Sequence, residues 1–247
     1  MIWSCGAHLG DALWTANFLR RMPGEHTFHV LPEYVNGIAE LMSDRPVKIL
    51  STEDNRPADA RDTWIANASL EGRGVFYRGQ EDIMGFVMEY HNHLGGEAGM
   101  PCPVYNTRQE MLWDSASILA AVPRVPHPDL LVINSDPRSG QCPEYSRSEM
   151  MEVIETLRHR YPHLRITCTN INGVDDWSLA EIAAMSITAK YIVAVANGPH
   201  WATWNIWNQN AHRVILLSPM RLDFSTPGKT EHAANAAGVW NIMRGWL

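Results

Sequence analysis

Short apolar runs alternate with helix-like segments along this chain, and the alternation restricts the fold more than any other feature. Strands are predicted from Ile2, at 26–31 and at 47–50, and amphipathic helices are predicted between them at 11–21 and 34–42. A β-α-β-α-β order is typical of a parallel sheet with helices on its faces. The sequence therefore predicts an α/β protein that begins with a Rossmann-like, doubly wound domain.

The same alternation starts again after a proline-rich joint formed by Pro123, Pro126 and Pro128. Further strands are predicted at 130–133, 164–168, 191–195 and 214–217, with helices after Ser146 and Ser178 and a C-terminal helix at 231–244. We therefore predict two domains, residues 1–125 and 126–247. Two such domains facing each other would form a cleft, which is a preferred kind of ligand site.

The stretch between these patterns is less regular. It predicts a helix or strand at 63–70, a strand at 75–77, and helices at 83–93 and 107–122. A loop from Gly95 to Pro103 is a candidate acceptor loop because glycine and proline punctuate it. His91 and His93 are two residues apart and do not share a helix face, which disfavours a metal pair there.

Composition narrows the class of protein. The chain has 247 residues and a formal net charge of −7, which disfavours broad nucleic-acid binding by simple attraction. It has no apolar run of membrane-spanning length and no secretory signal, so we expect a cytoplasmic protein without a membrane span. The four cysteines are scattered without metal-ligand spacing, and we expect reduced thiols and no bound metal.

The N-terminal strand, glycine-containing turn and helix form the first candidate site. Such a turn lies at the carboxyl edge of a parallel sheet, where open α/β folds bind ligands. Gly6 and Gly10 bracket the turn and can take positive φ angles without a Cβ clash. His8 and Asp11 would lie at this edge. The alternative interpretation of Asp11 is a helix N-cap without a chemical role.

Several segments together resemble the family 9 glycosyltransferases, which are the ADP-heptose:lipopolysaccharide heptosyltransferases and their relatives. Gly10-Asp11-Ala12-Leu13 is similar to the Gly-Asp-x-Leu start of that family, and 189–202 resembles its segment ending in Asp-Ser/Thr-Gly-Pro-x-His. Residues 178–185 resemble the helix before that segment, and 131–134 resemble the strand leading to the donor-phosphate loop. Ala196 stands where the family has aspartate, one residue is missing before His200, and Arg138 is the nearest substitute for the family's lysine.

The resemblance implies a GT-B fold, in which residues 1–125 form a compact Rossmann-like acceptor domain and residues 126–247 form the nucleotide-sugar donor domain. It also implies inversion at the anomeric carbon, a nucleotide-sugar co-substrate and no required metal or other cofactor. Asp11 is the candidate catalytic base, because a desolvated cleft carboxylate is a better proton acceptor. His8 is a second candidate, or a residue that orients the acceptor.

The candidate donor-binding residues follow three strands of the second half. The helix after the 191–195 strand offers free N–H groups at its start, and a charged His200 there could assist the leaving group. The complete set is Ser135, Arg138, Ser139, Thr169, Asn170, Asn197, Gly198, Pro199 and His200. The alternative for each is an ordinary role in a turn or cap.

The sequence leaves several functions open. The first is transfer of a sugar to an acceptor hydroxyl on a cell-surface saccharide, a small molecule or a hydroxymethylated base of phage-type DNA, the last being disfavoured by the net charge. The second is a nucleotide-sugar epimerase. The third is a non-catalytic nucleotide- or saccharide-binding module, which the substitution at Ala196 favours.

Overall fold

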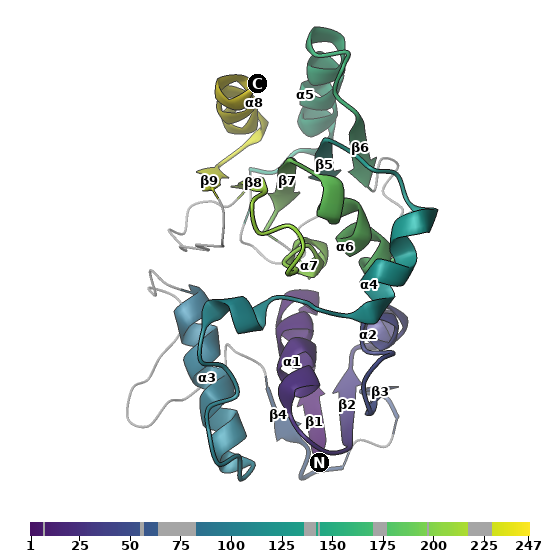
Figure 1. Ribbon diagram of the computed structural model, residues 1–247, viewed down its shortest axis with the longest axis vertical. Coiled ribbons are helices and arrows are strands. Elements are labelled where there is room, and N and C mark those ends of the chain that lie inside the picture. Colours follow the sequence, from purple (N-terminus) through teal and green to yellow (C-terminus); the bar gives the residue numbers. More distant parts are fainter. Residues whose placement is uncertain are drawn as a thin grey trace. The chain divides into compact units, whose positions relative to one another are not determined.

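The computed structural model describes the chain except for residues 7, 55–56, 64–82, 136–141, 143, 170–176, 197 and 217–228. The chain forms two units, one of Met1–Ala120 and one that begins at Ala121, and each contains a parallel sheet (Figure 1). The α/β class and the two parallel sheets predicted from the sequence are confirmed. The strand predicted at 75–77 and the element predicted at 64–70 lie outside the described residues.

The first unit has four parallel strands in the order β3-β2-β1-β4. Their bounds are β1 Ile2–Cys5, β2 His26–Val30, β3 Val47–Ser51 and β4 Arg61–Asp62. Helix α1, Leu9–Arg21, connects β1 to β2, and the short helices η1, Pro32–Tyr34, and α2, Val35–Leu41, connect β2 to β3. The first fifty residues thus fold as predicted, whereas the two-residue strand β4 carries no hydrophobic pattern that would have revealed it.

Helix α3, Ile83–Glu97, is longer than predicted and includes the two glycines that we expected in a loop. The helix ends where Gly99 adopts φ +86°, the Gly99 N–H donates to the Gly96 carbonyl oxygen, and the Met100 N–H donates to that of Gly95. This pattern is a Schellman motif. A Cβ on Gly95 would lie 2.6 Å from Val104 Cγ2, so glycine allows the following loop to pack against the helix.

The single helix predicted at 107–122 is wrong. The segment contains a 3₁₀ turn, η3 Arg108–Met111, and helix α4, Ala116–Ala121, followed by η4 Val122–Arg124. Thr107 and Glu110 form a capping box around η3, after which Leu112 is extended. Hydrogen bonds to residues distant in the sequence hold the segment that follows: Arg20 binds Asp114 at 2.8 Å, and Asp44 Oδ2 accepts from the Ala116 N–H at 3.0 Å. Contacts distant in sequence therefore override the local helical pattern.

The second unit has five parallel strands in the order β6-β5-β7-β8-β9. Their bounds are β5 Leu130–Ile133, β6 Ile166–Thr169, β7 Tyr191–Val195, β8 His212–Leu216 and β9 Thr230–Ala233. The helices are α5 Arg147–Arg160, α6 Leu179–Thr188, α7 Gly198–Ala202 and α8 Ala236–Trp246. The helix expected from residue 231 starts later, because 230–233 pair with β8 and Asn235 caps α8.

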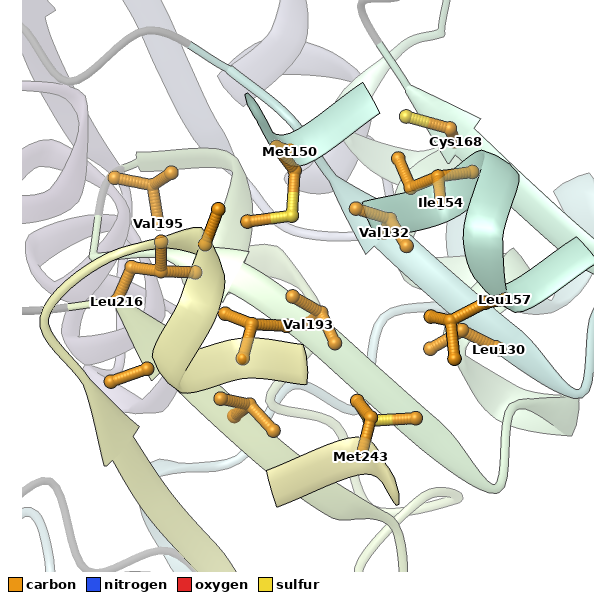
Figure 2. Packing of buried hydrophobic residues seen from close by; sticks show 14 of the residues in the cluster. Leu130, Val132, Met150, Ile154, Leu157, Cys168, Val193, Val195, Leu216 and Met243 are labelled. Atoms are coloured by element: carbon orange, nitrogen blue, oxygen red, sulfur yellow. The ribbon is translucent and has the colours of Figure 1, made fainter. Parts of the chain in front are cut away.

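The core of the second unit lies between one face of this sheet and helices α5 and α8 (Figure 2). Alternate strand residues such as Val132, Val193 and Leu216 pack against Met150 and Met243 from the two helices. The intervening strand residues are also buried, among them Leu131, Ile133 and Ile192. Because successive side chains of a strand point to opposite faces, both faces of the sheet are covered.

His91 of helix α3 is part of the core of the first unit. Its ring stacks on Phe18 with the ring centroids 4.8 Å apart, and neither ring nitrogen has a hydrogen-bond partner among the described residues. Burial lowers the pKa of His91 to about 3. His93, by contrast, is half-buried with Nε2 3.3 Å from Glu97 Oε1, so the two histidines do not meet.

We expect His91→Phe to make the protein less sensitive to acid. The folded protein keeps His91 neutral, whereas the unfolded chain binds a proton near pH 6.5. The free energy of unfolding of the wild type is therefore fully retained above pH 6.5. It declines below pH 6.5 because of this group, by about 2 kcal/mol at pH 5. Phenylalanine keeps the ring contact with Phe18 and removes this loss. Urea unfolding at pH 7.5 and pH 5, with His93→Gln as control, measures the difference. Equal acid losses in His91→Phe and wild type would contradict it.

Candidate functional site

The strand order of each sheet reverses at one position, and such positions are where open α/β folds bind ligands at the carboxyl ends of the strands. In the first unit the reversal lies between β1 and β4, and in the second it lies between β5 and β7. Gly6 and Thr63 follow β1 and β4, and Asn134 and Ala196 follow β5 and β7. The candidate site residues of each unit lie close to these positions in the sequence.

Helix α1 carries the candidate base in its first turn. His8 is the N-cap, although its side chain makes no capping bond, and Asp11 is the third helical residue. Asp11 is therefore not the N-cap that the alternative interpretation required. Gly10 belongs to the first helical turn, and among the described glycines positive φ occurs at Gly24 and Gly99, so Gly6 and Gly10 do not use the positive φ that glycine permits.

The environment of Asp11 favours the protonated form of its carboxyl group. The residue is half-buried, and desolvation raises the pKa of Asp11 to about 7, although a backbone hydrogen bond lowers it in part. Asp11 therefore exchanges a proton near neutral pH, as a general base requires. His8 is exposed at the beginning of the same helix.

Buried hydroxyl groups fix α1 against the sheet one turn after Asp11. Thr15 Oγ1 donates to Thr63 Oγ1 at 3.0 Å, and Thr63 Oγ1 donates to the Ser4 carbonyl oxygen at 3.0 Å. The Thr63 N–H donates to the same Ser4 oxygen at 2.9 Å. These bonds connect α1, β1 and the end of β4, so they position the turn that carries Asp11 at the carboxyl edge.

The described donor-site candidates lie at the carboxyl ends of three neighbouring strands of the second unit. Thr169 is the last residue of β6, in register with Ile133 of β5, and Ser135 follows β5. Gly198, Pro199 and His200 form the start of α7 after β7, with Pro199 second in the helix rather than first. Arg138, Ser139, Asn170 and Asn197 lie outside the described residues.

His200 is a neutral histidine in this structure, which corrects the charged form expected from the sequence. Complete burial, reinforced by Arg213 and His232, lowers the pKa of His200 well below its ordinary value. The Trp204 indole Nε1–H donates to His200 Nε2 at 3.0 Å, which assigns the ring proton to Nδ1. Nδ1 is buried without a hydrogen-bond partner among the described residues. His200 therefore offers a neutral N–H donor rather than a positive charge.

A buried polar network holds the segment after His200. Arg213 donates to Asn208 Oδ1 at 2.9 Å and to Thr203 Oγ1 at 3.2 Å, and Thr203 Oγ1 donates to the His200 carbonyl oxygen at 2.7 Å. Burial lowers the pKa of Arg213 to about 9. Sequence reasoning missed Trp204 and this network, because Trp204 lies beyond the end of α7 and no local pattern indicates its contact with His200.

The two parallel-sheet units fit a two-domain GT-B-like fold. No protein-family model matches the sequence, and no curated protein matches it. Among solved structures, the chain is similar to the E. coli heptosyltransferase WaaC with ADP, with a TM-score of 0.60, 13% identity, and coverage of 100% of this chain and 98% of that chain.

Two further structures show the same fold. One is the family 9 glycosyl transferase from Veillonella parvula DSM 2008, with a TM-score of 0.52 and 9% identity over 99% of this chain and 90% of that chain. The other is heptosyltransferase TibC from enterotoxigenic E. coli H10407, in complex with ADP-D-β-D-heptose, with a TM-score of 0.51 and 14% identity over 92% of this chain and 61% of that chain. The chain thus has a family 9, heptosyltransferase-like fold, and the resemblance predicted from the sequence is confirmed for the fold.

Two features bear on membranes and metals. None of the helices in the described ranges is long and apolar enough to cross a bilayer. Within the same ranges, histidine, cysteine, aspartate and glutamate form no group of three or more that could hold a metal ion.

We expect Trp204→Phe to release the His200 tautomer. The substitution keeps an aromatic ring but removes the N–H that donates to His200 Nε2, so both neutral tautomers become available. Nitrogen-15 NMR of the imidazole should show an unprotonated Nε2 in the wild type and an averaged shift in Trp204→Phe. Trp201→Phe, which leaves the Trp204 bond in place, is the control. A wild type protonated at Nε2 would contradict the assignment.

Proposed function

We propose that this protein is a metal-independent, inverting glycosyltransferase that moves a sugar from a nucleotide-diphosphate sugar to an acceptor hydroxyl. The fold that it shares with heptosyltransferases supports this class of reaction. The observation that carries the proposal is Asp11, a half-buried carboxyl group in the first turn of α1 with a pKa of about 7. The reaction uses no cofactor besides its nucleotide-sugar co-substrate, and we expect it in the cytoplasm.

In the proposed reaction Asp11 is the general base. Its carboxylate takes the proton of the acceptor hydroxyl while the hydroxyl oxygen attacks the anomeric carbon. The bond from that carbon to the diphosphate breaks, and its electron pair leaves on the diphosphate oxygen. This single displacement inverts the anomeric centre. A base whose pKa lies near the working pH combines availability with proton affinity, and His8, at the start of the same helix, orients the acceptor.

The second unit binds the donor in this proposal. The departing diphosphate gains negative charge, and oriented N–H and O–H groups stabilise it without a metal. His200 supplies the Nδ1–H donor, and Ser135, Arg138, Ser139, Asn197, Gly198 and Pro199 form the remainder of the phosphate contacts. Thr169 and Asn170 contact the nucleobase or ribose. The nucleotide sugars named with the similar structures, ADP and ADP-D-β-D-heptose, are the first donors to examine.

The proposed acceptor is a cell-surface saccharide. A hydroxylated small molecule and a hydroxymethylated base in phage-type DNA are the other acceptors that the chemistry allows, since each presents a hydroxyl group. The net charge of −7 favours the saccharide over DNA.

We expect a nucleoside diphosphate to stabilise the protein in the presence of EDTA. A ligand that binds the folded state alone raises its stability by about 2.7 kcal/mol at a hundredfold excess over Kd. A thermal-shift series of nucleoside diphosphates and nucleotide sugars measures this effect and identifies the nucleobase of the donor. No shift with any nucleotide would contradict the donor site.

We expect Asp11→Asn to lose about a hundredfold or more in transfer while its Kd for the nucleoside diphosphate stays unchanged. In the wild type, transfer should rise about tenfold per pH unit below pH 7 and level off above it, because the deprotonated carboxylate is the active form. Asp59→Asn, which removes an exposed carboxylate of the same unit, should transfer normally.

Full transfer by Asp11→Asn would show that Asp11 is not the base. Nucleotide binding without transfer to any acceptor by the wild type would instead favour a non-catalytic binding module. Ala196, buried where the family has aspartate, is the feature that favours this second candidate.

A further inference from the structure

Asn134 follows strand β5 at the strand-order reversal of the second unit, and a neighbouring phenol fixes its side chain. The Tyr145 hydroxyl donates to Asn134 Oδ1 and, at 3.2 Å, to the Asn134 carbonyl oxygen. An amide oxygen accepts and an amide nitrogen donates. With Oδ1 accepting from Tyr145, Nδ2 lies on the other side of the amide.

The Nδ2 donor of Asn134 is buried, and it has no hydrogen-bond partner among the described residues. Native structures seldom keep a buried donor unpaired unless a ligand or a water satisfies it. A second unpaired group lies at the same edge, since Thr169 Oγ1 is buried at the end of β6, in register with Ile133. Two buried polar groups with unused bonding capacity thus stand at the ends of adjacent strands.

We propose that Asn134 Nδ2 donates a hydrogen bond to the diphosphate of the nucleotide and that Tyr145 is its positioning residue. The inference rests on the proposed function and adds a residue to its donor site. Phosphate oxygens are acceptors only, and the described residues at these strand ends, Asn134, Ser135, Thr169 and Ala196, include no carboxylate to repel them. His200 Nδ1–H, after β7, is a second neutral donor. Asn134 and His200 are arranged alike. An aromatic side chain donates a hydrogen bond to one polar atom of each, and the N–H on the opposite side of each has no described partner.

Asn134→Asp tests the donor directly. One carboxylate oxygen can still accept from Tyr145, while the other places negative charge where the N–H was. We expect the affinity for ADP, or for whichever nucleoside diphosphate stabilises the wild type most, to fall at least about tenfold at pH 8 in calorimetry with EDTA. The affinity for the corresponding nucleoside should not change.

Two further variants separate the diphosphate contact from general damage. Tyr145→Phe keeps Asn134 but frees its amide, and we expect about threefold to tenfold weaker diphosphate binding with unchanged nucleoside binding. Asn210→Asp makes the same charge change on an exposed asparagine just before β8, at the amino edge of the sheet, and should bind like the wild type. Thermal unfolding of each variant shows that it is folded.

The outcomes distinguish this inference from the function on which it rests. If the wild type binds a nucleoside diphosphate and both Asn134→Asp and Tyr145→Phe bind it equally well, Asn134 is not a donor residue and the glycosyltransferase proposal stands. If the wild type binds no nucleoside diphosphate, the Asn134 assignment and the glycosyltransferase proposal are both wrong. An equal loss of nucleoside and diphosphate binding in Asn134→Asp would overturn the assignment in favour of a structural role. An unfolded Asn134→Asp leaves the decision to Tyr145→Phe.

Discussion

A parallel sheet with both faces covered has room for polar side chains chiefly at its strand ends, and this constraint shapes the second unit. All four residues of β5 are buried and apolar, and the first polar side chains come immediately after it, at Asn134 and Ser135. A buried polar group is costly unless it is bonded, so each needs a partner. Those partners also decide which bonding positions are left: Tyr145 satisfies one end of Asn134, and Trp204 satisfies one end of His200.

The need of a buried polar group for a partner also explains why the pKa values of two partly buried carboxylates of the first unit differ. For Asp44, burial alone would raise the pKa, but hydrogen bonds from Arg20 and from the Ala116 N–H outweigh it and lower the pKa. Among the described residues no cation pairs with Asp11, and desolvation raises its pKa to about 7. Removing Asp44 would take one of two described carboxylate partners from the buried Arg20, which is a structural role. The carboxyl group without a counter-charge is the one able to exchange protons near neutrality.

The sequence predicted those parts of the fold that local patterns encode. The apolar runs of β1, β5 and β7 identified strands, and Ser178 with Glu181 identified the start of α6 through the capping box that the structure contains. The failures have tertiary causes. Gly95 and Gly96 looked like loop residues because glycine usually breaks helices, but the last turn of α3 uses Gly95 for close packing.

Two other failures have the same kind of cause. Residues 230–233 show helical periodicity when they are considered together with residues 234–244, yet pairing with β8 makes them a strand. The sequence suggested that a charged His200 could assist the leaving group, because it lies near the start of the helix after the 191–195 strand. Its burial and its bond from Trp204 depend on the packing of residues that hydropathy cannot rank as buried, such as Asn208 and Arg213. The position of a candidate residue was therefore predictable, whereas its protonation state was not.

The groups assigned to the proposed reaction differ between the two units in whether their protonation changes near neutral pH. His200 is kept neutral by burial, and the Asn134 amide does not titrate at all, so the donors assigned to the diphosphate keep their form across the neutral range. Among the residues assigned to catalysis, Asp11 has a pKa that falls within that range. A charged histidine would have strengthened diphosphate binding at low pH, where the base is protonated and inactive. Neutral donors avoid this conflict, because they let nucleotide binding stay constant while the activity follows the ionisation of one carboxyl group.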